Sequence, residues 1–448
     1  MKIQTERPTR FFIKSYGCQM NSYDTQRMED SLLEAGYKKA NAIEDADVAV
    51  FNTCCIREKA GEKLFSDLGR LRLLKEKSGG DCLIAVTGCI SQFQREELLQ
   101  RAPYVAIILG PQDIQQIASG VREVMRKDRN KIIATTMNAG DKFRRLSRNF
   151  YARNVSESLT IQEGCDNFCT YCVVPFSRGR GFSRPAVDVI SEAKKLMDLG
   201  VKEIILLGQN VNSYSGEGSD GKTWNLHRVL LELAQLDGLK RLRYITSHPK
   251  DIDENMAKAH SDIDILAPSI HLPVQSGSDD VLAKMNRRYS ADEYLKCVEM
   301  LRKYRPDMAV SSDFIVGFPG ETETDFQRTL RLIEEVKFSQ GYSFKYSPRP
   351  NTAAAKMEDQ TPESIKSERL KVLQALLNRQ QQEFNHNFVG KRLNVLLTKV
   401  GKHKNQLSGR SEYSQAVSVC ATNVAIGDIV SVMVTGAASY SLLGAVAE

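Results

Sequence analysis

Along the first part of the chain, short apolar runs alternate with longer stretches in which apolar residues recur at helical spacing. The runs predict strands, and the longer stretches predict a helix after each strand. The expected strands are 11–15, 47–51, 82–86 and 105–109, and the expected helices are 23–35, 57–75, 92–100 and 113–126. Strands that alternate with helices in this way predict a parallel sheet, so residues 1–128 are expected to form an α/β domain.

A second region, residues 158–384, repeats the alternation of strand and helix. Its expected strands are 159–162, 203–207, 242–246, 269–272, 308–316 and 342–346. Six such units predict an incomplete parallel barrel of the (βα)6 kind, whose site lies at the carboxyl ends of the strands. A polar helix over 361–390 is expected to lead out of this domain.

The pattern changes after residue 384. Short β-rich runs at 393–397, 416–419 and 429–434 are separated by turns that contain glycine. They predict a small antiparallel β-barrel of the OB kind over residues 385–448. The apolar end, 429–447, is interrupted by Ser, Thr and Gly, so it predicts two strands rather than a membrane helix. The expected fold class is therefore α/β with a small C-terminal β-barrel.

Composition narrows the class of protein. With 448 residues, of which 42% are hydrophobic and 26% are charged, the chain has the profile of a globular protein of several domains. The polar start, residues 1–10, has no apolar core, so we expect no signal peptide and a cytoplasmic location. In that compartment, ten cysteines predict metal ligands or catalytic groups rather than disulfides.

The net charge of +7 fits an acidic partner, and two segments concentrate basic residues. Residues 129–157 are expected to be a basic linker, for which contact with a polyanion and a solvated face remain equally open. Its basic residues are Arg129, Lys131, Lys142, Arg144, Arg145, Arg148 and Arg153. Residues 391–410 contain no Asp or Glu, which predicts a nucleic-acid surface, with a plain solvated surface as the alternative. The candidates for phosphate contacts are Arg392, Lys399, Lys402, Lys404 and Arg410.

Three cysteines follow the first expected strand of the second region. Cys165, Cys169 and Cys172 have the spacing C-x3-C-x2-C, and Tyr171 precedes the third. Thiolates are ligands for zinc, copper(I) and iron–sulfur clusters. A closed structural zinc site has four protein ligands, whereas this loop offers three. Three thiolates on a four-iron cluster would leave one iron open to a substrate; a zinc knuckle or a chance trio is the alternative.

A second trio of cysteines is spread over the first domain. Cys18, Cys54 and Cys89 each come just after one of its first three expected strands. Because ligands bind at the carboxyl ends of parallel strands, the three thiols are expected to converge at one edge of the sheet. Three unrelated buried cysteines are the alternative, and Cys55 competes with Cys54 as a ligand. The remaining cysteines, Cys82, Cys297 and Cys420, are expected in the core.

These segments together resemble the methylthiotransferases, a family of radical S-adenosylmethionine (SAM) enzymes, over nearly the whole chain. The resemblance rests on Gly17-Cys18-Gln19-Met20-Asn21, on Asn52-Thr53-Cys54 with Arg57, on Gly88-Cys89, and on residues 163–172, 271–278 and 346–349. Residues 173–180 and 246–249 look like the MiaB-type tRNA enzymes within that family. The C-terminal barrel resembles a TRAM domain, an RNA-binding module. Asn351-Thr352 departs from the Gly-Thr of the family, which affects one turn.

The resemblance implies SAM and two 4Fe-4S clusters as cofactors. Cys165, Cys169 and Cys172 would ligate the cluster whose open iron binds SAM and cleaves it reductively to a 5′-deoxyadenosyl radical. Cys18, Cys54 and Cys89 would ligate an auxiliary cluster that holds the transferred sulfur. Glycines and polar residues at the barrel's strand ends suit a polar ligand, so the candidates for SAM contacts are Tyr171, Gly208, Gln209, Asn210, Gln275, Ser276 and Gly317. His248 and His271, also at strand ends, are expected to be structural rather than metal ligands.

The implied reaction is methylthiolation of carbon-2 of N6-isopentenyl-adenosine next to the tRNA anticodon. An aromatic C–H has no useful acidity, so radical chemistry at the cofactors breaks it and no residue is expected to act as an acid or base. The expected partners are the tRNA anticodon arm, SAM, an electron donor and a sulfur source, with no membrane. The alternative substrates are threonylcarbamoyl-adenosine in tRNA and a ribosomal protein. A non-catalytic iron–sulfur protein that binds RNA or senses redox state is the alternative of another class.

Overall fold

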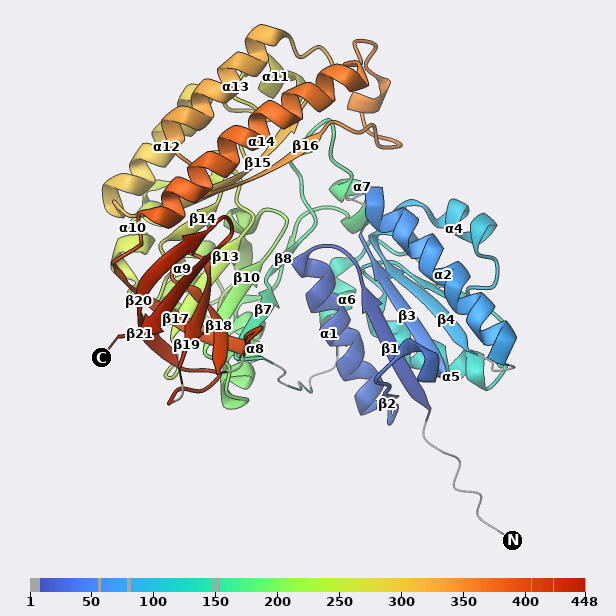
Figure 1. The fold of residues 1–448 in the computed structure, drawn as a ribbon. Helices are drawn as coiled ribbons and strands as arrows, with labels where there is room; N and C mark the ends of the chain where they lie inside the picture. Colours follow the sequence, from blue (N-terminus) through green and yellow to red (C-terminus); the bar gives the residue numbers. More distant parts are fainter. Residues whose placement is uncertain are drawn as a thin grey trace. The chain divides into compact units, whose positions relative to one another are not determined.

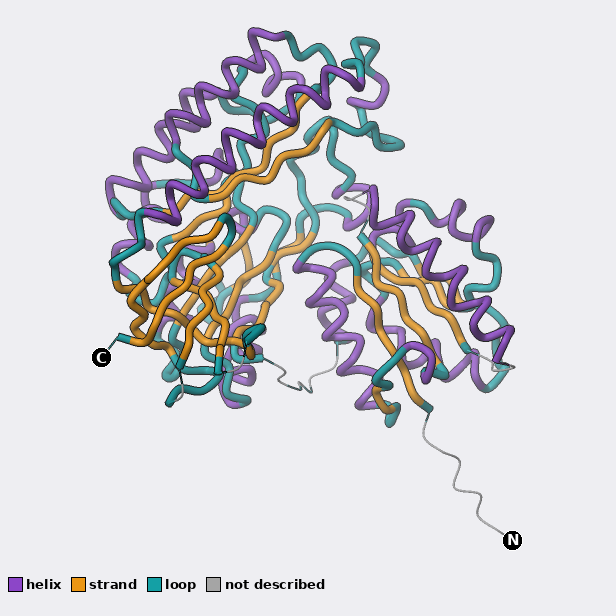
Figure 2. The backbone as a smooth tube through the Cα atoms, in the orientation of Figure 1, coloured by secondary structure: helices purple, strands orange, loops and turns teal. Residues whose placement is uncertain are grey.

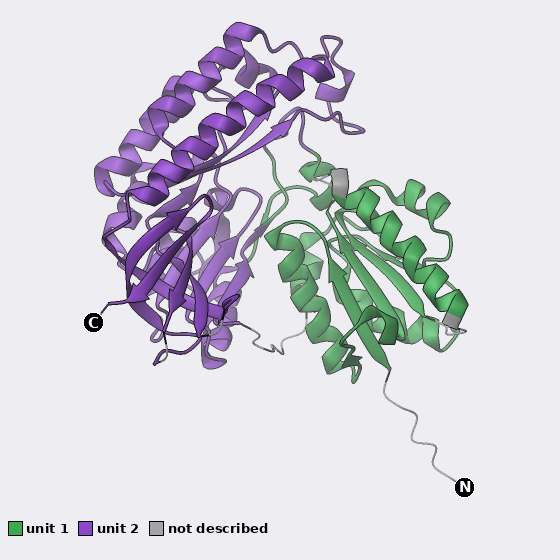
Figure 3. Cartoon of the chain, viewed as in Figure 1, with its two compact units in different colours: residues 1–151, 163–166, 173–184 green, residues 152–162, 167–172, 185–448 purple. Residues whose placement is uncertain are grey.

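The computed structural model describes residues 9–54, 58–78, 82–146, 149, 151, 154–403, 405–421 and 423–447. The chain divides into two compact units (Figure 3). Unit 1 comprises Met1–Tyr151, Glu163–Asp166 and Val173–Arg184, and unit 2 comprises Ala152–Gln162, Asn167–Cys172 and Pro185–Glu448. None of the helices in the described ranges is both long enough and apolar enough to cross a membrane.

Unit 1 is built around a six-stranded parallel sheet with the order β2-β1-β3-β4-β5-β6 (Figure 1). The strands are β1 (Arg10–Ser15), β2 (Lys38–Lys39), β3 (Val48–Thr53), β4 (Leu83–Gly88), β5 (Ile107–Leu109) and β6 (Ile132–Ala134). The helices are α1 (Gln19–Glu34), α2 (Glu58–Ser78), α3 (Cys89–Phe93), α4 (Arg95–Arg101), α5 (Ile117–Met125), α6 (Ala139–Arg145) and α7 (Val174–Arg178). The predicted α/β domain with a parallel sheet is confirmed.

Helices cover both faces of this sheet, which explains why β3 is apolar at successive positions. Every residue of β3 is buried. Ala49 and Phe51 belong to a core cluster that includes Leu64 of α2, whereas Val48 and Val50 belong to a second cluster with residues of α1 and α5. A parallel strand that is packed on both sides has no solvent face, so it shows an apolar run instead of an alternation.

The segment 129–157, predicted to be a linker, is in part a structured piece of unit 1, and the prediction is corrected here. β6 pairs in parallel with β5, and α6 begins after Asn138, whose side chain accepts a hydrogen bond from the amide of Asp141. This helix buries Lys142 completely, so that residue is not available for contact with a polyanion. The run of basic residues was misleading because the acidic partners of Lys142 are distant in sequence. Arg148 and Arg153 lie outside the described residues.

Unit 2 begins with six parallel strands in two hydrogen-bonded sheets, β13-β10-β7 and β14-β15-β16. The strands are β7 (Ser156–Thr160), β10 (Glu203–Leu207), β13 (Arg241–Ile245), β14 (Ser269–His271), β15 (Ala309–Val316) and β16 (Gln340–Lys345). The amide of Ser247 donates to the carbonyl of His271, which joins the ends of β13 and β14. The predicted incomplete barrel of six parallel strands is confirmed.

Helices and short connections complete this part of unit 2, with helices alongside β15 and β16 (Figure 2). The helices are α8 (Ala186–Asp198), α9 (Leu226–Ala234), α10 (Glu254–Asp262), α11 (Asp279–Lys284), α12 (Ala291–Tyr304), α13 (Glu323–Val336) and α14 (Glu363–His386). The strands β11 (Ser215–Glu217) and β12 (Thr223–Asn225) form a hairpin. The short strands β8 (Gln162–Glu163) and β9 (Phe182–Ser183) lie where the chain passes between units. α14 packs on β16, where a side chain at Gly341 would collide with Leu377.

The C-terminal part of unit 2 is a closed five-stranded barrel with the order β17-β18-β19-β21-β20. Its strands are β17 (Arg392–Val400), β18 (Gln406–Ser411), β19 (Ala416–Cys420), β20 (Ile429–Ala438) and β21 (Ser441–Val446). Val395, Val417 and Val432 are among the buried residues of its core. The small barrel was predicted, but it is not purely antiparallel, because β19 and β21 pair in parallel.

The three cysteines expected in the core have different environments. Cys297 is buried in α12, as predicted, and Cys82 is partly buried just before β4. Cys420 is exposed, which corrects the prediction for that residue. Val417 and Val419 occupy the inward positions of β19, and side chains alternate between the two faces of a strand, so residue 420 faces solvent.

Two buried arginines of β13, Arg241 and Arg243, fix the small barrel to the rest of unit 2. They donate to four backbone carbonyls of the barrel at 2.6–3.0 Å, those of Asn394, Arg410, Ser411 and Glu412. Glu203 of β10 accepts from Arg243 at 2.8 Å and compensates its charge. Arg241 and Glu203 are the first residues of their strands, so the small barrel docks at the end of the sheet opposite to the expected cofactor site.

Candidate functional site

Three cysteines of unit 1 lie together at the carboxyl edge of the parallel sheet. Cys18 is the N-cap of α1, just after β1; Cys54 directly follows β3; and Cys89 begins α3, directly after β4. The sheet pairs the residues before the last two, Thr53 and Gly88, so Cys54 and Cys89 leave neighbouring strand ends. Cys54 hydrogen-bonds to Cys18. The structure thus places the three cysteines that the sequence singled out at neighbouring strand ends of one sheet edge. The competing Cys55, with Arg57, lies outside the described residues.

Two glycines allow the loops that carry these cysteines to approach one another closely. Gly17 has a φ of +130°, and a Cβ there would lie 2.3 Å from the Cβ of Cys54. Gly88 has a φ of +92°, and a Cβ there would lie 2.4 Å from the carbonyl oxygen of Thr53. A side chain at either position would push the loops apart, so the glycines are part of the site's construction.

The side chains of Asn21 and Asn52 fix the first two strand ends. Asn21 donates to the carbonyl of Thr53 at 2.9 Å and to the side-chain oxygen of Asn52 at 3.1 Å. Asn52 donates to the carbonyl of Asn21 at 2.8 Å. The oxygen Oδ1 of Asn21 lies 3.1 Å from the sulfur of Cys18. These reciprocal bonds position Cys18 and Cys54 through rigid neighbours.

The surroundings of Cys18 favour its thiolate. A hydrogen bond from Cys54 lowers the pKa of Cys18 to about 6; burial opposes the shift, and the guanidinium of Arg178 adds to it. The thiolate is the form of cysteine that ligates metals. Beside Cys89, the buried hydroxyls of Thr87 and Ser91 have no hydrogen-bond partner among the described residues. The Cys18 thiolate, a nearby cation and available hydroxyl donors fit an iron–sulfur cluster at this edge.

Arg178 belongs to a buried group of four charged residues in unit 1 that the sequence analysis missed. Asp24 accepts from Lys142 at 2.7 Å and from Arg178 at 2.9 Å. Glu163 accepts from Lys142 at 2.8 Å and also from Arg178. All four side chains are at most 3% exposed, so two cations and two anions compensate one another without water. The signal available in the sequence was that Glu163 and Arg178 flank the cysteine loop.

The loop with the other three cysteines spans the division of the chain. Cys165 belongs to unit 1, where its amide donates to the carbonyl of Gly179 at 3.2 Å. Cys169 and Cys172 belong to unit 2 and are joined by a backbone hydrogen bond of 2.9 Å. Among the described residues, no three His, Cys, Asp or Glu side chains form a group that could hold one metal ion. Cysteines on a four-iron cluster each bind a different iron, so they need not meet at one point.

The carboxyl ends of the barrel strands in unit 2 carry buried polar atoms that no described residue satisfies. They are Oδ1 of Asn210 after β10, Oγ of Ser247 and Nε2 of His248 after β13, and Oη of Tyr346 after β16. Buried polar groups normally have partners, so a cluster of unpaired ones at one set of strand ends fits a polar ligand such as SAM. Asn210 was predicted for this role. Ser247 and Tyr346 were missed, although their place directly after a strand was the signal used for Asn210.

The other candidate SAM residues have varied surroundings. The amides of Gln209 and Asn210 both donate to Oε1 of Gln162, at 2.9 and 3.2 Å, and a side chain at Gly208 would collide with Gln162. This strand end is therefore a tight turn. Gln275 is buried and has a φ of +76°, a conformation held by the amide's bond to the carbonyl of Asp313.

Two of the candidates already have internal partners. The hydroxyl of Ser276 lies 3.2 Å from that of Thr329, and the amide of Gly317 donates to Glu321 at 2.6 Å. Only the backbone shape of these two turns is left for a ligand. Tyr171 packs against the core cluster that contains Tyr346, in unit 2.

The two histidines at strand ends are held by protein contacts. Nδ1 of His248 accepts from the amide of Lys250 at 3.4 Å, and burial lowers the pKa of His248 to about 2, with Arg287 acting in the same direction. His248 is therefore neutral, with its proton on Nε2. His271 lies 3.0 Å from the hydroxyl of Ser311 and 3.4 Å from the carboxylate of Asp313.

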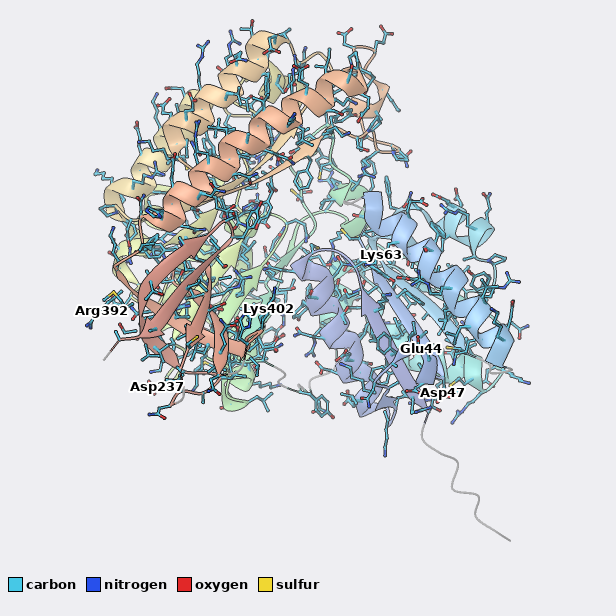
Figure 4. The ribbon with its side chains drawn as sticks, in the orientation of Figure 1. Glu44, Asp47, Lys63, Asp237, Arg392 and Lys402 are labelled. Atoms are coloured by element: carbon cyan, nitrogen blue, oxygen red, sulfur yellow. The ribbon has the colours of Figure 1, made fainter. Side chains whose placement is uncertain are left out.

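Basic side chains are exposed on the small barrel of unit 2. Arg392 and Lys399 on β17, Lys402 in the following loop and Arg410 on β18 are all exposed; Arg392 and Lys402 are labelled in Figure 4. Arg410 donates to the carbonyl of Ser414 at 2.8 Å, which orders its side chain. Lys404 lies outside the described residues. The described candidates are therefore accessible to a polyanion.

Family models and relatives cover nearly the whole chain. Residues 10–110 match the Uncharacterized protein family UPF0004, residues 159–333 match the Radical SAM superfamily and residues 387–447 match the TRAM domain. A tRNA-2-methylthio-N(6)-dimethylallyladenosine synthase of Agrobacterium fabrum is 49% identical over 445 residues, which are 98% of this chain and 97% of the relative. A protein of the same name from Bartonella bacilliformis is 49% identical over 441 residues, 97% of this chain and 96% of the relative.

Solved structures show the same fold at low sequence identity. The radical SAM methyltransferase TsrM from Kitasatospora setae, with cobalamin and a [4Fe-4S] cluster bound, is 12% identical, with a TM-score of 0.57 over 78% of this chain and 74% of TsrM. The cobalamin-dependent radical SAM enzyme OxsB is 11% identical, with a TM-score of 0.52 over 83% of this chain and 56% of OxsB. At these identities the likeness concerns the fold alone.

Proposed function

The chain belongs to the family of tRNA-2-methylthio-N(6)-dimethylallyladenosine synthases within the radical SAM superfamily, and we propose that it transfers a methylthio group to carbon-2 of N6-isopentenyl-adenosine next to the tRNA anticodon. The observation that carries the proposal is the 49% identity over 98% of the chain. A match over 98% of the chain spans both cysteine trios and the C-terminal barrel, the parts to which the proposal assigns roles.

The chain uses SAM and an iron–sulfur cluster, as enzymes of its superfamily do. Cys165, Cys169 and Cys172 hold this cluster in the proposal, and Cys18, Cys54 and Cys89 hold a second, auxiliary one. The first cluster with SAM supplies a radical for the unreactive aromatic C–H, and the auxiliary cluster supplies the sulfur. The proposal of the second cluster is supported by the contact of Cys54 with Cys18 and by Arg178 beside Cys18 and Cys89.

The protein's own groups bind and orient SAM. Asn210, Ser247 and Tyr346 offer buried, unsatisfied oxygens at three strand ends to its amino acid group and ribose hydroxyls. His248 offers a neutral N–H and carries no charge that would repel the sulfonium. Gly208, Gln209, Gln275, Ser276 and Gly317 contribute tight backbone turns, and Tyr171 contributes an apolar ring. None of these side chains is assigned a proton-transfer step.

The partners follow from the chemistry of the reaction. The substrate is the anticodon arm of a tRNA, whose loop bases are cheaper to unstack than paired ones, and the TRAM barrel binds the arm. Arg392, Lys399, Lys402, Lys404 and Arg410 are the proposed phosphate contacts. SAM cleavage needs a one-electron donor, and each turnover consumes a sulfur atom that a sulfide source must replace. The proposed location is the cytoplasm.

Mass spectrometry of tRNA nucleosides from a strain that lacks the gene tests the proposal. We expect loss of the methylthio form of isopentenyl-adenosine alone, its return with the wild-type gene and no return with Cys169→Ala. Loss of a methylthio threonylcarbamoyl nucleoside instead would assign the other tRNA substrate. Unchanged tRNA would leave a ribosomal protein as the substrate or a non-catalytic role, and would overturn the proposal.

A further inference from the structure

Arg287 of unit 2 is a buried arginine with no carboxylate partner among the described residues. Four other buried arginines have a carboxylate partner at 2.7–2.9 Å: Arg27 with Asp30, Arg178 with Asp24, Arg243 with Glu203 and Arg369 with Glu321. Buried Arg241 lies 3.9 Å from Glu203. Arg287 is 5% exposed, and its neighbours among the described residues are hydroxyl, carbonyl and thiol groups rather than carboxylates. A buried charge without a counter-charge is strongly unfavourable, so the position implies an anion that arrives with a ligand.

The contacts of Arg287 aim its charge at the cysteine loop. Nη1 donates to the sulfur of Cys169 at 3.6 Å. Nη2 donates to the carbonyl of Pro273 at 2.5 Å, and Nε donates to the hydroxyl of Tyr289 at 2.8 Å. That hydroxyl in turn donates to the carbonyl of Val274 at 2.9 Å. Two fixed acceptors therefore leave the guanidinium one orientation, and its remaining edge faces the thiol.

The residues just before Arg287 hold the same loop through hydrogen bonds. The amide of Thr170 donates to the carbonyl of Met285 at 3.1 Å, and its hydroxyl donates to that of Lys284 at 2.8 Å. The side chain of Asn286 donates to two carbonyls of the loop at 3.0 and 3.2 Å, those of Phe168 and Asn167. Asn286 and Arg288 have φ values of +58° and +56°, which are unfavourable for residues with a Cβ. These two positions flank Arg287, and the side chains of both Asn286 and Arg287 contact the loop.

We propose that Arg287 is a positioning residue that raises the reduction potential of the SAM-cleaving cluster, while residues 284–286 hold the loop of Cys169. The proposal rests on the proposed function. Uptake of one electron from an external donor makes a cluster with cysteine thiolates more negative. A fixed cation that donates an N–H to one of those sulfurs stabilises the reduced form more than the oxidised form. The cluster then accepts the electron from a weaker donor.

A redox titration of the reconstituted full-length protein tests this role. The protein is titrated with titanium(III) citrate under anaerobic conditions, and the reduced cluster is followed by electron paramagnetic resonance. The change of the signal on addition of SAM identifies the SAM-cleaving cluster. In Arg287→Gln we expect the equilibrium constant for reduction of that cluster to fall at least tenfold, which is about 59 mV for a one-electron couple. Arg288→Gln is the matched control: it removes the same charge from the exposed neighbour and should change the constant less than twofold.

The outcomes separate this proposal from the function itself. A wild-type protein without a SAM-responsive cluster would refute the proposed function. A responsive cluster with the same potential in Arg287→Gln, or an equal shift in Arg288→Gln, would refute only the role of Arg287. If Arg287→Gln did not retain iron, Arg287→Lys decides: it keeps the charge but loses the fixed fork, so a smaller downward shift is expected, and an unchanged potential would overturn the proposal.

Discussion

The charges in the interior of unit 1 show how much a single residue depends on partners that are distant in sequence. Lys142 lies among Asp24 and Glu163, and Arg178 completes the group. Loss of one member of a buried ion pair costs about 3–5 kcal/mol, because the remaining charge is uncompensated. The exposed pair Arg144–Asp141 on the same helix contributes about 0–1 kcal/mol. Two neighbouring basic residues of α6 thus have different roles.

The sequence could not distinguish those two roles. Cysteines are rare and chemically specific, so the spacing of Cys165, Cys169 and Cys172 and the strand-end positions of Cys18, Cys54 and Cys89 indicated two trios. The structure places Cys18 with Cys54 as expected. Lys142 is one of many lysines, and its partner Asp24 is 118 residues away. Nothing local marks it as buried. The role of a residue was therefore predictable from the sequence for cysteines, which have few roles in proteins. It was not predictable for a residue such as Lys142, whose role is set by tertiary contacts.

At the same scale, we predict that His248→Gln reduces the acid sensitivity of the apo-protein. Burial, with Arg287 second, lowers the pKa of His248 to about 2 in the folded state. The unfolded chain takes up a proton below about pH 6.5, so stability is full above that pH and is lost as the pH falls. Between pH 7 and pH 5 one such histidine accounts for about 2 kcal/mol of unfolding free energy. Urea unfolding at pH 7 and pH 5 should show that the unfolding free energy of the variant falls less than that of the wild type, by about this amount.

The comparison contains its own control. Burial also lowers the pKa of His260, to about 4, and this residue contributes the same acid sensitivity to both proteins. At pH 8 both histidines are neutral in the folded and unfolded states. A difference in unfolding free energy between wild type and variant at this pH therefore reports packing alone. The same loss of stability between pH 7 and pH 5 in wild type and variant would contradict the burial of an uncharged His248.

At the scale of elements, strand ends determine where the chemistry lies. β1, β3 and β4 point in the same direction, so residues that follow them meet at one edge of the sheet. This rule needs only the position and direction of each strand, and an apolar run such as β3 supplies both. The rule therefore predicted from the sequence that Cys18, Cys54 and Cys89 lie at one edge of the sheet. The same rule pointed to Asn210. Ser247 and Tyr346 also follow strands directly, so the rule would have identified them too.

Elements were missed where local signals are weak. β2 and β6 have two and three residues, too few for a pattern to be recognised. The helix predicted at 92–100 is two helices, α3 and α4, separated at Gln94. The parallel pairing of β19 with β21 depends on how the barrel closes, which strand patterns do not contain. Short or topologically determined features thus lie beyond sequence reasoning.

The strand-end argument predicts the iron content. If each trio holds a 4Fe-4S cluster, the reconstituted wild type should contain about eight irons per chain. Replacing Cys18, Cys54 and Cys89 by Ala should halve this number and prevent formation of thiolated product. Cleavage of SAM should survive, because Cys165, Cys169 and Cys172 remain. Iron is measured by colorimetric assay, and 5′-deoxyadenosine by chromatography.

A second triple variant controls for the loss of three thiols. Cys82, Cys297 and Cys420 replaced by Ala should leave the iron content near that of the wild type. Full iron in the first triple variant would contradict the assignment of the auxiliary site. If Cys55→Ala lost iron and Cys54→Ala did not, the ligand would be Cys55 instead of Cys54.

At the scale of the whole molecule, the small barrel is an integral part of unit 2. Arg241 and Arg243 are buried and donate to backbone carbonyls of the barrel. Deletion of residues 385–448 would remove these acceptors and expose two cations beside Glu203. A truncated protein would therefore differ in stability as well as in RNA binding. Substitutions of exposed side chains test the barrel's role more directly.

We predict that Arg392, Lys399, Lys402 and Arg410, replaced together by Gln, weaken tRNA binding strongly and flatten its dependence on salt. Each lost phosphate contact reduces the slope of log affinity against log salt by about 0.7 in a single-stranded region. The substituted side chains are exposed and form no part of the core, so the fold and SAM cleavage should remain. Binding is measured by filter retention at several salt concentrations.

The control for this variant must remove the same charge from elsewhere in unit 2. Lys258 on α10 is half-buried, and Lys296, Lys303 and Lys371 on α12 and α14 are exposed. Their replacement by Gln lowers the net charge equally. A general attraction between a basic protein and RNA would respond to both variants alike, whereas a specific surface responds only to the first. Equal losses of affinity would therefore assign the effect to net charge. Unchanged affinity in the barrel variant would show that the barrel has a structural role and that other residues hold the tRNA.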